Sequence, residues 1–339
     1  MKEFHFSEKW AILAALRQGE WVSLGKWGAI AASETMKSMS VSPLRMLLPA
    51  VLFPQRDPSR LIGGSHYLVS PSLEENPSIY NDPQTLFDPD SWKIMPFLPS
   101  EEKPLATALS LVKEAALLPA LIIDSGNPEK GVIHIPEEAF SELTHRHRNW
   151  MIAARAIIPV RHGQAELIAF RPDDGGPEQV ALVFGKPTDN PLVRLHSECL
   201  TGDVFGSQRC DCGEQLNGAM QRLSEARQGG ILLYLAQEGR GIGLVNKLRA
   251  YQLQDKGLDT FDANLRLGFG ADERTYEAAA AMLKTLGFRK IDLLSNNPEK
   301  AKALMLHDIH VSMVSHAFPP NRHNESYLAA KSNRFKHLV

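Results

Sequence analysis

The alternation of hydrophobic and polar positions predicts a few regular elements in the first 150 residues. An amphipathic helical pattern covers residues 7–18, with Ser7 as its N-cap and Gly19 as its stop. A second helical pattern covers 105–118, and the apolar run 120–124 is typical of a buried strand. We therefore expect an α/β domain here, of uncertain fold and without a recognisable group of catalytic side chains.

The pattern changes after residue 150. Short apolar runs separated by Gly, Asp and Pro predict strands at 153–161, 165–170, 179–184, 192–195, 230–234, 290–294 and 310–314. Helical periods predict helices at 210–228, 243–254, 274–286, 298–306 and 324–334. Strands that first follow one another and then alternate with helices predict an α/β domain with a mixed sheet.

Composition supports a division of the chain near this point. Eleven of the 22 prolines lie between Pro43 and Pro104, which predicts short pieces and irregular connections there. All five tryptophans lie at or before Trp150, and all three cysteines follow it. A length of 339 residues is enough for two domains, which we expect at 1–150 and 151–339.

Charge and hydropathy limit the class of protein. The formal net charge is −2 and the pI is about 6.6, so no overall basic field favours nucleic acid. The first residues lack the apolar run of a signal peptide, and no apolar stretch has the length of a membrane span. We expect a soluble cytoplasmic protein that binds neither nucleic acid nor membranes.

The three cysteines are the strongest chemical signal. Cys199, Cys210 and Cys212 fall within fourteen positions. An odd number of cysteines with an i, i+2 pair favours a shared soft cation over disulfides, and zinc is the usual cation for thiolates. A fourth ligand from water would make the site catalytic, whereas His196 would complete a structural zinc site. Three buried thiols without metal are a further alternative.

Three polar turns follow predicted strands in the same domain. Residues 237–243 combine glycines with Arg240, which suits either an anion or a tight turn. Asp272 and Arg274 precede a predicted helix, which Asp272 could instead cap. Residues 295–300 form an Asn-Asn-Pro turn followed by Lys300. Because ligands collect beyond the carboxyl ends of strands in open α/β sheets, these turns predict a polyphosphate pocket beside the metal.

These motifs together resemble GTP cyclohydrolase II, from about residue 155 to the end of the chain. The matching runs are Arg194-Leu195-His196-Ser197-Glu198-Cys199, Arg209-Cys210-Asp211-Cys212, Gln237-Glu238-Gly239-Arg240, Asn246-Lys247-Leu248-Arg249-Ala250-Tyr251, Asp259-Thr260 and Asn264 to Arg274. They keep their order across the whole second domain. The resemblance implies a zinc-dependent hydrolysis of GTP that yields a diaminopyrimidine, formate and pyrophosphate, as the first step of riboflavin biosynthesis.

The resemblance also implies a role for each matching residue. Cys199, Cys210 and Cys212 would hold one Zn2+ per subunit, and a water at its fourth position would attack C8 of guanine. The residues that would bind GTP are Arg194, Leu195, His196, Ser197, Glu198, Gln215, Glu238, Gly239, Arg240, Thr260, Ser295 and Lys300. Ser295 stands where relatives often have Thr, so the hydroxyl is kept. Mg2+ is expected with the triphosphate, and the chain is expected to form a homodimer.

Three further residues would act in catalysis. Tyr251 matches the tyrosine thought to assist the step at C8. Asp272 and Arg274 match the pair described as proton acceptor and nucleophile toward the α-phosphate. Guanidinium stays protonated at working pH, so a clamp on the departing pyrophosphate is the more comfortable role for Arg274 on general grounds.

The first domain departs from what many relatives carry there. A dihydroxybutanone phosphate synthase domain often precedes this one, and residues 10–34 are faintly similar to its opening. The acidic metal-binding loop of that synthase is replaced by Gly25-Lys26-Trp27-Gly28. We therefore expect residues 1–150 to be a non-catalytic extension, and a degenerate synthase-like origin is one possibility for it.

Two alternatives to a riboflavin enzyme stay open. Cyclohydrolase-II-like enzymes of uracil catabolism share the zinc cysteines and often carry an N-terminal extension. A non-enzymatic zinc module that binds GTP is the second alternative. The presence of Tyr251, Asp272 and Arg274 argues against a pure binding module, which needs none of these groups.

Overall fold

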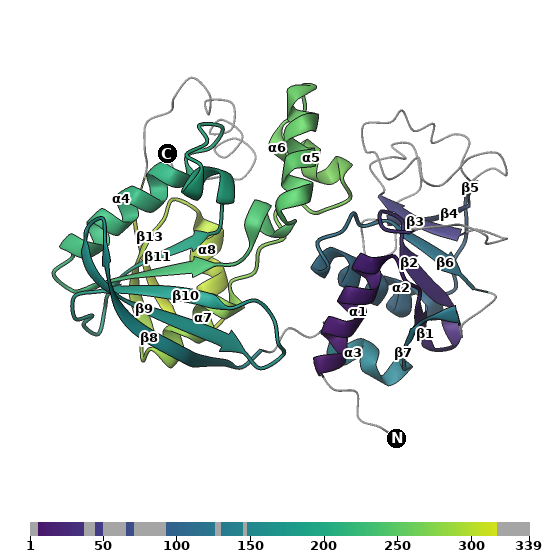
Figure 1. The fold of residues 1–339 in the computed structure, drawn as a ribbon, viewed down its shortest axis with the longest axis horizontal. Coiled ribbons are helices and arrows are strands. Elements are labelled where there is room, and N and C mark those ends of the chain that lie inside the picture. Colours follow the sequence, from purple (N-terminus) through teal and green to yellow (C-terminus); the bar gives the residue numbers. More distant parts are fainter. Residues whose placement is uncertain are drawn as a thin grey trace. The chain divides into compact units, whose positions relative to one another are not determined.

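The computed structural model describes residues 6–36, 45–49, 66–70, 93–125, 130–144 and 148–316. The chain forms two compact units (Figure 1). The first comprises residues 1–147 together with 245–273, and the second comprises 148–244 together with 274–339. The segment 245–273 thus groups with the first unit, although it belongs by sequence to the expected second domain.

The second unit contains a seven-stranded mixed sheet, as predicted. Its strands, in chain order, are β8 (Trp150–Val160), β9 (Gly163–Pro172), β10 (Gln179–Phe184), β11 (Leu192–Ser197), β12 (Gly230–Leu235), β13 (Lys290–Leu294) and β14 (His310–Val314). Their spatial order is β14-β13-β11-β12-β10-β9-β8. The first four in that order are parallel to one another, and the remaining pairs are antiparallel.

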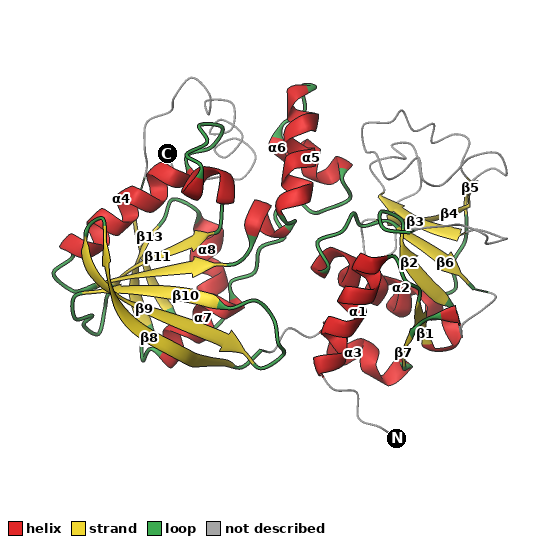
Figure 2. Ribbon diagram, viewed as in Figure 1, coloured by secondary structure: helices red, strands yellow, loops and turns green. Residues whose placement is uncertain are grey.

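Helices cover both faces of this sheet (Figure 2). Side chains alternate between faces along a strand, and β12 shows the result. Leu232 joins a hydrophobic cluster with Leu223 of α4 (Cys212–Glu225). Its neighbour Leu233 joins the opposite cluster, with residues of α7 (Glu277–Thr285) and α8 (Pro298–Met305). The largely apolar sequence of β12 follows from this two-sided burial.

The first unit contains a second seven-stranded sheet. Its strands are β1 (Val22–Leu24), β2 (Ala29–Ala32), β3 (Arg45–Pro49), β4 (His66–Ser70), β5 (Lys93–Ile94), β6 (Leu121–Asp124) and β7 (Ile133–Ile135), in the order β5-β4-β3-β6-β2-β1-β7. Only the β1–β7 pair is parallel among these described strands. Helices α1 (Phe6–Gln18), α2 (Pro99–Glu114) and α3 (Phe140–Thr144) share one hydrophobic core with it.

Two further helices belong mostly to this unit, α5 (Leu244–Asp255) and α6 (Thr260–Arg266). The pattern of the sequence did not predict α6, which has only seven residues and begins at the cap Asp259. The prediction of a helix at 243–254 is confirmed. None of the described helices is long and apolar enough to cross a membrane.

Most predicted elements of the second unit agree with the structure to within a few residues, with three exceptions. The helix expected from residue 210 begins at Cys212, which leaves Cys210 in the preceding turn. The helix expected from Arg274 begins at Glu277 with Tyr276 as its N-cap, so the capping role considered for Asp272 is wrong. The helix expected at 324–334 lies outside the described residues.

Candidate functional site

Three neighbouring parallel strands bring the predicted motifs to one edge of the sheet. Strands β13, β11 and β12 lie side by side and run in the same direction, so their carboxyl ends meet. The cysteine run follows β11, the glycine-rich turn follows β12, and Ser295 follows β13. Hydrogen bonds connect the ends of β11 and β12: Gln237 Nε2 donates to Ser197 Oγ at 3.1 Å, and the Glu198 amide donates to the Leu235 carbonyl at 2.8 Å.

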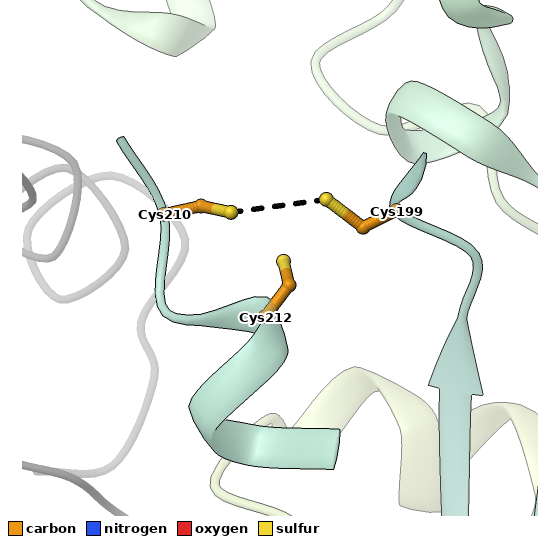
Figure 3. Close-up of side chains that lie close together, drawn as sticks. All are labelled: Cys199, Cys210 and Cys212. Atoms are coloured by element: carbon orange, nitrogen blue, oxygen red, sulfur yellow. Dashed lines mark hydrogen bonds between the residues drawn. The ribbon is translucent and has the colours of Figure 1, made fainter. Parts of the chain in front are cut away.

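The three cysteines converge on one point (Figure 3). Their sulfurs all lie within 4.8 Å of one another, and Cys199 Sγ is 3.7 Å from Cys210 Sγ. Tetrahedral zinc with Zn–S bonds of about 2.3 Å places two thiolates about 3.8 Å apart. Within the described part of the chain, this group contains no histidine or carboxylate. The spacing of the three thiols therefore suits a cation held by thiolates, such as zinc.

A glycine leaves the space that this cluster needs. Gly202 lies in the turn after Cys199, where a Cβ would stand 3.0 Å from Cys210 Sγ and 3.2 Å from Cys199 Sγ. The same Cβ would be 3.0 Å from the Cβ of Cys212. A side chain at this position would therefore press on all three sulfur-bearing residues. Gly202 falls within the cysteine run, but local sequence gives no reason to single it out.

The surroundings of the thiols do not favour thiolates by themselves. Hydrogen bonding to Cys199 is the main reason that the pKa of Cys210 rises to about 11, and burial adds to it. The pKa of Cys212 is raised well above its usual value, first by hydrogen bonds to the other two cysteines. A cation bound by such a cluster would displace the thiol protons, because metal binding releases them.

Asp203 is the acceptor for several hydrogen bonds next to Cys199. Its carboxylate accepts hydrogen bonds from His196 Nε2 at 3.0 Å, the Tyr234 hydroxyl at 2.9 Å and the Cys199 amide at 3.0 Å. The rings of His196 and Tyr234 stack with centroids 5.6 Å apart. His196 thus directs Nε2 at Asp203 and is not part of the cysteine group. The alternative of a structural site completed by His196 finds no support in this geometry.

The same contacts shift two pKa values. Burial is the main cause that lowers the pKa of His196, although its bond to Asp203 opposes the shift. Loss of solvent and the nearby Asp203 charge raise the pKa of Tyr234. The imidazole of His196 is therefore neutral and the phenol of Tyr234 keeps its proton. Asp203 lies inside a matching run, but its role is visible only once the fold brings its three donors together.

Arg194 and Gln215 meet beside the cysteines. The buried guanidinium donates through Nη1 to the Leu294 carbonyl at 2.9 Å, and through Nη2 to Gln215 Oε1. Gln215 in turn donates to Asp211 at 2.5 Å. Burial lowers the pKa of Arg194 to about 10. Because Arg194 Nε is buried without a hydrogen-bond partner, this side chain still has a donor available for a ligand.

The glycine-rich turn after β12 adopts left-handed backbone. Gly239 has φ 65°, Arg240 has φ 61° and Gly241 has φ 89°. Glycine takes such angles at little cost, which explains two of these positions, whereas Arg240 is strained by roughly 1–2 kcal/mol. Glu238 accepts from the Leu200 amide at 2.7 Å and from the Gly239 amide at 2.7 Å. This carboxylate therefore ties the turn to the residue after Cys199.

The turn after β13 also has its own internal bonds. Ser295 Oγ accepts from the Asn297 amide at 3.1 Å, and Asn297 caps α8. Lys300 on α8 is buried and donates to the Leu195 carbonyl at 2.8 Å. These contacts bring Ser295 and Lys300 to the same sheet edge as Leu195 and Arg194. The same contacts stabilise the turn and the start of α8 without any ligand.

Four further predicted residues lie in or next to the segment 245–273. Tyr251 on α5, Thr260 at the start of α6 and Asp272 in the following segment group with the first compact unit. Lys247 Nζ lies 5.8 Å from the centre of the Tyr251 ring. Arg274 is the first residue of the returning second unit.

Comparison with known proteins gives one consistent family. A sequence profile of GTP cyclohydrolase II matches residues 151–315. A GTP cyclohydrolase-2 of Azospirillum brasilense is 38% identical and covers 96% of this chain, over 92% of its own length. A GTP cyclohydrolase-2 of Pseudomonas paraeruginosa is 47% identical over 192 residues, which are 56% of this chain and 93% of that protein.

Other similar proteins are longer or more distant. A riboflavin biosynthesis protein RibBA of Staphylococcus epidermidis is 46% identical over 192 residues, and the match spans only 48% of that protein. Among solved structures, RibBX, a two-domain 3,4-dihydroxy-2-butanone 4-phosphate synthase from A. baumannii, aligns over 85% of this chain and 93% of its own. Its TM-score is 0.28 at 15% identity, which is too low for a conclusion about fold or activity.

Proposed function

This chain belongs to the GTP cyclohydrolase II family, and we propose that it hydrolyses GTP as the first step of riboflavin biosynthesis. The products would be formate, pyrophosphate and 2,5-diamino-6-(5-phospho-ribosylamino)pyrimidin-4(3H)-one. Two waters are consumed at C8, which leaves as formate, and one at the bond between the α- and β-phosphates. The observation that best supports this proposal is the convergence of three thiols at the sheet edge that also presents Arg194 and Gln215.

Cys199, Cys210 and Cys212 would hold Zn2+. When bound, zinc would supply a Lewis acid that lowers the pKa of a water beside C8. Asp203 and Glu238 would keep the chain around Cys199 in place through its amide and that of Leu200. We expect the centre to be rigid before substrate arrives.

The remaining residues would bind and orient GTP. Arg194 and Gln215 offer fixed donors near the base, and Arg240 offers a planar fork for phosphate. Lys300 donates to the Leu195 carbonyl at the end of β11, and we propose that its ammonium also contacts a phosphate of GTP. The other proposed contacts come from Leu195, His196, Ser197, Glu198, Gly239, Thr260 and Ser295. Mg2+ would accompany the triphosphate.

Tyr251 would assist at C8, and Asp272 with Arg274 would act at the α-phosphate. For Arg274 we favour a clamp that stabilises the charge of the departing pyrophosphate, because guanidinium is a poor nucleophile. We also propose a homodimer and a cytoplasmic location, since a reducing compartment keeps cysteines free for metal binding. Residues 1–150 would carry no synthase activity.

The test is an incubation with GTP and Mg2+ that quantifies formate, pyrophosphate and the absorbance of the diaminopyrimidine. We expect one formate per pyrophosphate and one zinc per chain. Cys210→Ser should lose zinc and ring opening together. GTP binding without products would favour the non-enzymatic module, and turnover of a pyrimidine but not GTP would favour the uracil-catabolic alternative. Formation of dihydroxybutanone phosphate from ribulose 5-phosphate would contradict a non-catalytic first domain.

A further inference from the structure

The segment 245–273 is held by the first unit through a small set of polar contacts. Asn246 is fully buried, and its Nδ2 donates to the Ala116 carbonyl at 2.8 Å. Arg249 Nη2 pairs with Glu34 at 2.8 Å, and Lys113 Nζ pairs with Glu273 at 2.7 Å. Each contact joins residues more than one hundred positions apart in sequence, so none follows from local structure.

Glu34 links α5 to the chain that follows α2. One carboxylate oxygen accepts from Arg249, and the other accepts from the Leu118 amide at 2.7 Å. Arg249 also donates to Asn246 Oδ1 at 2.8 Å, which fixes the amide that reaches Ala116. The pair is largely shielded, because the side chains of Glu34 and Arg249 are only 14% and 21% exposed. Shielded charge-assisted bonds with several partners are the stronger kind.

The backbone that accepts from Asn246 is itself unusual. Ala116 has φ 56°, a left-handed conformation that disfavours residues other than glycine by roughly 1–2 kcal/mol. It lies just after α2, whose last turn carries Lys113. The end of α2 therefore presents a carbonyl to α5 and an ammonium to residue 273. Strained backbone persists where the surrounding contacts determine it, which agrees with a position that holds another segment.

The two segments held in this way are those that carry the proposed catalytic groups. Asn246 and Arg249 lie in α5 with Tyr251, five and two residues before it. Glu273 lies between Asp272 and Arg274, and it also accepts from the Gly270 amide at 2.6 Å. Lys113 thus fixes a carboxylate that shapes the backbone immediately before Asp272.

We infer that the first unit positions Tyr251 and Asp272 of the proposed cyclohydrolase, with Glu34 as the positioning residue for α5 and Lys113 as the positioning residue for residues 270–273. This inference rests on the proposed function for the roles of Tyr251 and Asp272. It gives the extension a task that needs no chemistry of its own. Small misplacements of a catalytic group by distant changes can lower kcat by up to about a hundredfold.

The experiment uses the full chain with Glu34→Gln and Lys113→Met. Glu34→Gln weakens the hold on α5, so kcat for formate should fall about tenfold or more while pyrophosphate release falls less. The ratio of formate to pyrophosphate then drops below one. Lys113→Met should slow pyrophosphate release at least as much as formate release, and Lys113→Arg should restore it. Zinc content and the KM for GTP should stay close to wild type.

A matched control removes a carboxylate charge of the same unit that touches neither segment. Glu137 pairs with Lys26 at 3.2 Å, and their side chains are 43% and 69% exposed. Glu137→Gln should leave kcat, the product ratio and zinc content unchanged. If Glu34→Gln behaves like Glu137→Gln in all three measurements, the positioning role is wrong.

Backbone hydrogen exchange separates this inference from the proposed function. Glu34→Gln should speed amide exchange in α5 relative to wild type, and Lys113→Met should do so at 270–273, with α4 unaffected in both. Unchanged exchange in an active enzyme would overturn the inference alone. Faster exchange in a protein that forms no products from GTP would overturn the proposed activity and leave the holding contacts in place. Loss of protection from amide exchange in α4 would show that a variant has unfolded as a whole. If Glu34→Gln unfolds in this way, the comparison of Lys113→Met with Lys113→Arg tests the inference instead.

Discussion

Gly202 offers the sharpest test of the metal centre, because one methyl group there meets all three sulfur-bearing residues. In Gly202→Ala the new Cβ would stand 3.0 Å from Cys210 Sγ and from Cys212 Cβ, and 3.2 Å from Cys199 Sγ. Favourable contacts between such atoms begin at about 3.5 Å, so the cluster must open by a few tenths of an ångström on three sides. Metal–ligand distances tolerate about 0.2 Å. The strain therefore falls directly on zinc binding.

The expected loss can be estimated from packing. Overfilling a well-packed site costs about 1–3 kcal/mol. If that strain is borne by the metal-bound state, zinc affinity should fall by a factor of roughly 5 to 150. The assay is competition for zinc between the protein and a chromophoric chelator, with bound zinc measured separately.

Gly287→Ala is the control for general destabilisation. Gly287 has φ 92° and open space around its missing Cβ, so alanine there strains the backbone without a clash. Its position before β13 is at the strand end opposite the cysteine edge. Gly287→Ala should lower the free energy of unfolding by about 1 kcal/mol and leave zinc affinity unchanged. Wild-type zinc affinity in Gly202→Ala would refute the steric reasoning.

Three further changes test other parts of the structure. Asp203→Asn replaces a carboxylate oxygen that accepts from polar donors by an amide NH2, so the free energy of unfolding should fall by about 2 kcal/mol in urea titrations. An unchanged midpoint would contradict the role of Asp203. Tyr251→Phe should suppress formate release while pyrophosphate release persists, and equal loss of both would indicate a structural tyrosine. Burial lowers the pKa of His66 to about 3, so its neutral form stabilises the fold above pH 6.5 and that contribution is lost as the pH falls toward 3. Between pH 7 and pH 5 the loss in the free energy of unfolding from His66 amounts to about 2 kcal/mol. Urea titrations over this pH range should show a smaller loss in His66→Gln than in the wild type.

Several features of this protein could be predicted from sequence because they depend on neighbours along the chain. Strands β10, β13 and β14 begin and end where the apolar runs 179–184, 290–294 and 310–314 do. Once β11, β12 and β13 are known as parallel strands, the rule that their carboxyl ends meet predicts that the cysteine run and Ser295 share one edge. The convergence of the three thiols agrees with the spacing of the cysteines.

Tertiary structure decided the features that join distant positions. Asp203 gains its role only because strand pairing brings Tyr234 and His196 beside it, thirty-one and seven residues away. Gly202 likewise has its role only because the folded chain brings Cys210 close to Cys199, which leaves no room for a side chain at position 202. Periodicity reports which face of an element is apolar, but it does not report which distant side chain lies opposite.

The grouping of residues 245–273 with the first unit shows the same limit. By sequence these residues continue the second domain, and the helical period of α5 was recognised correctly. Their partners, Glu34, Lys113 and Ala116, lie in the first 150 residues. An ion pair or a buried amide bond leaves no local pattern in either segment, because each partner alone resembles an ordinary polar position. The sequence thus determined the elements and the chemistry of their ends, and the packing of the folded chain determined which of them hold one another.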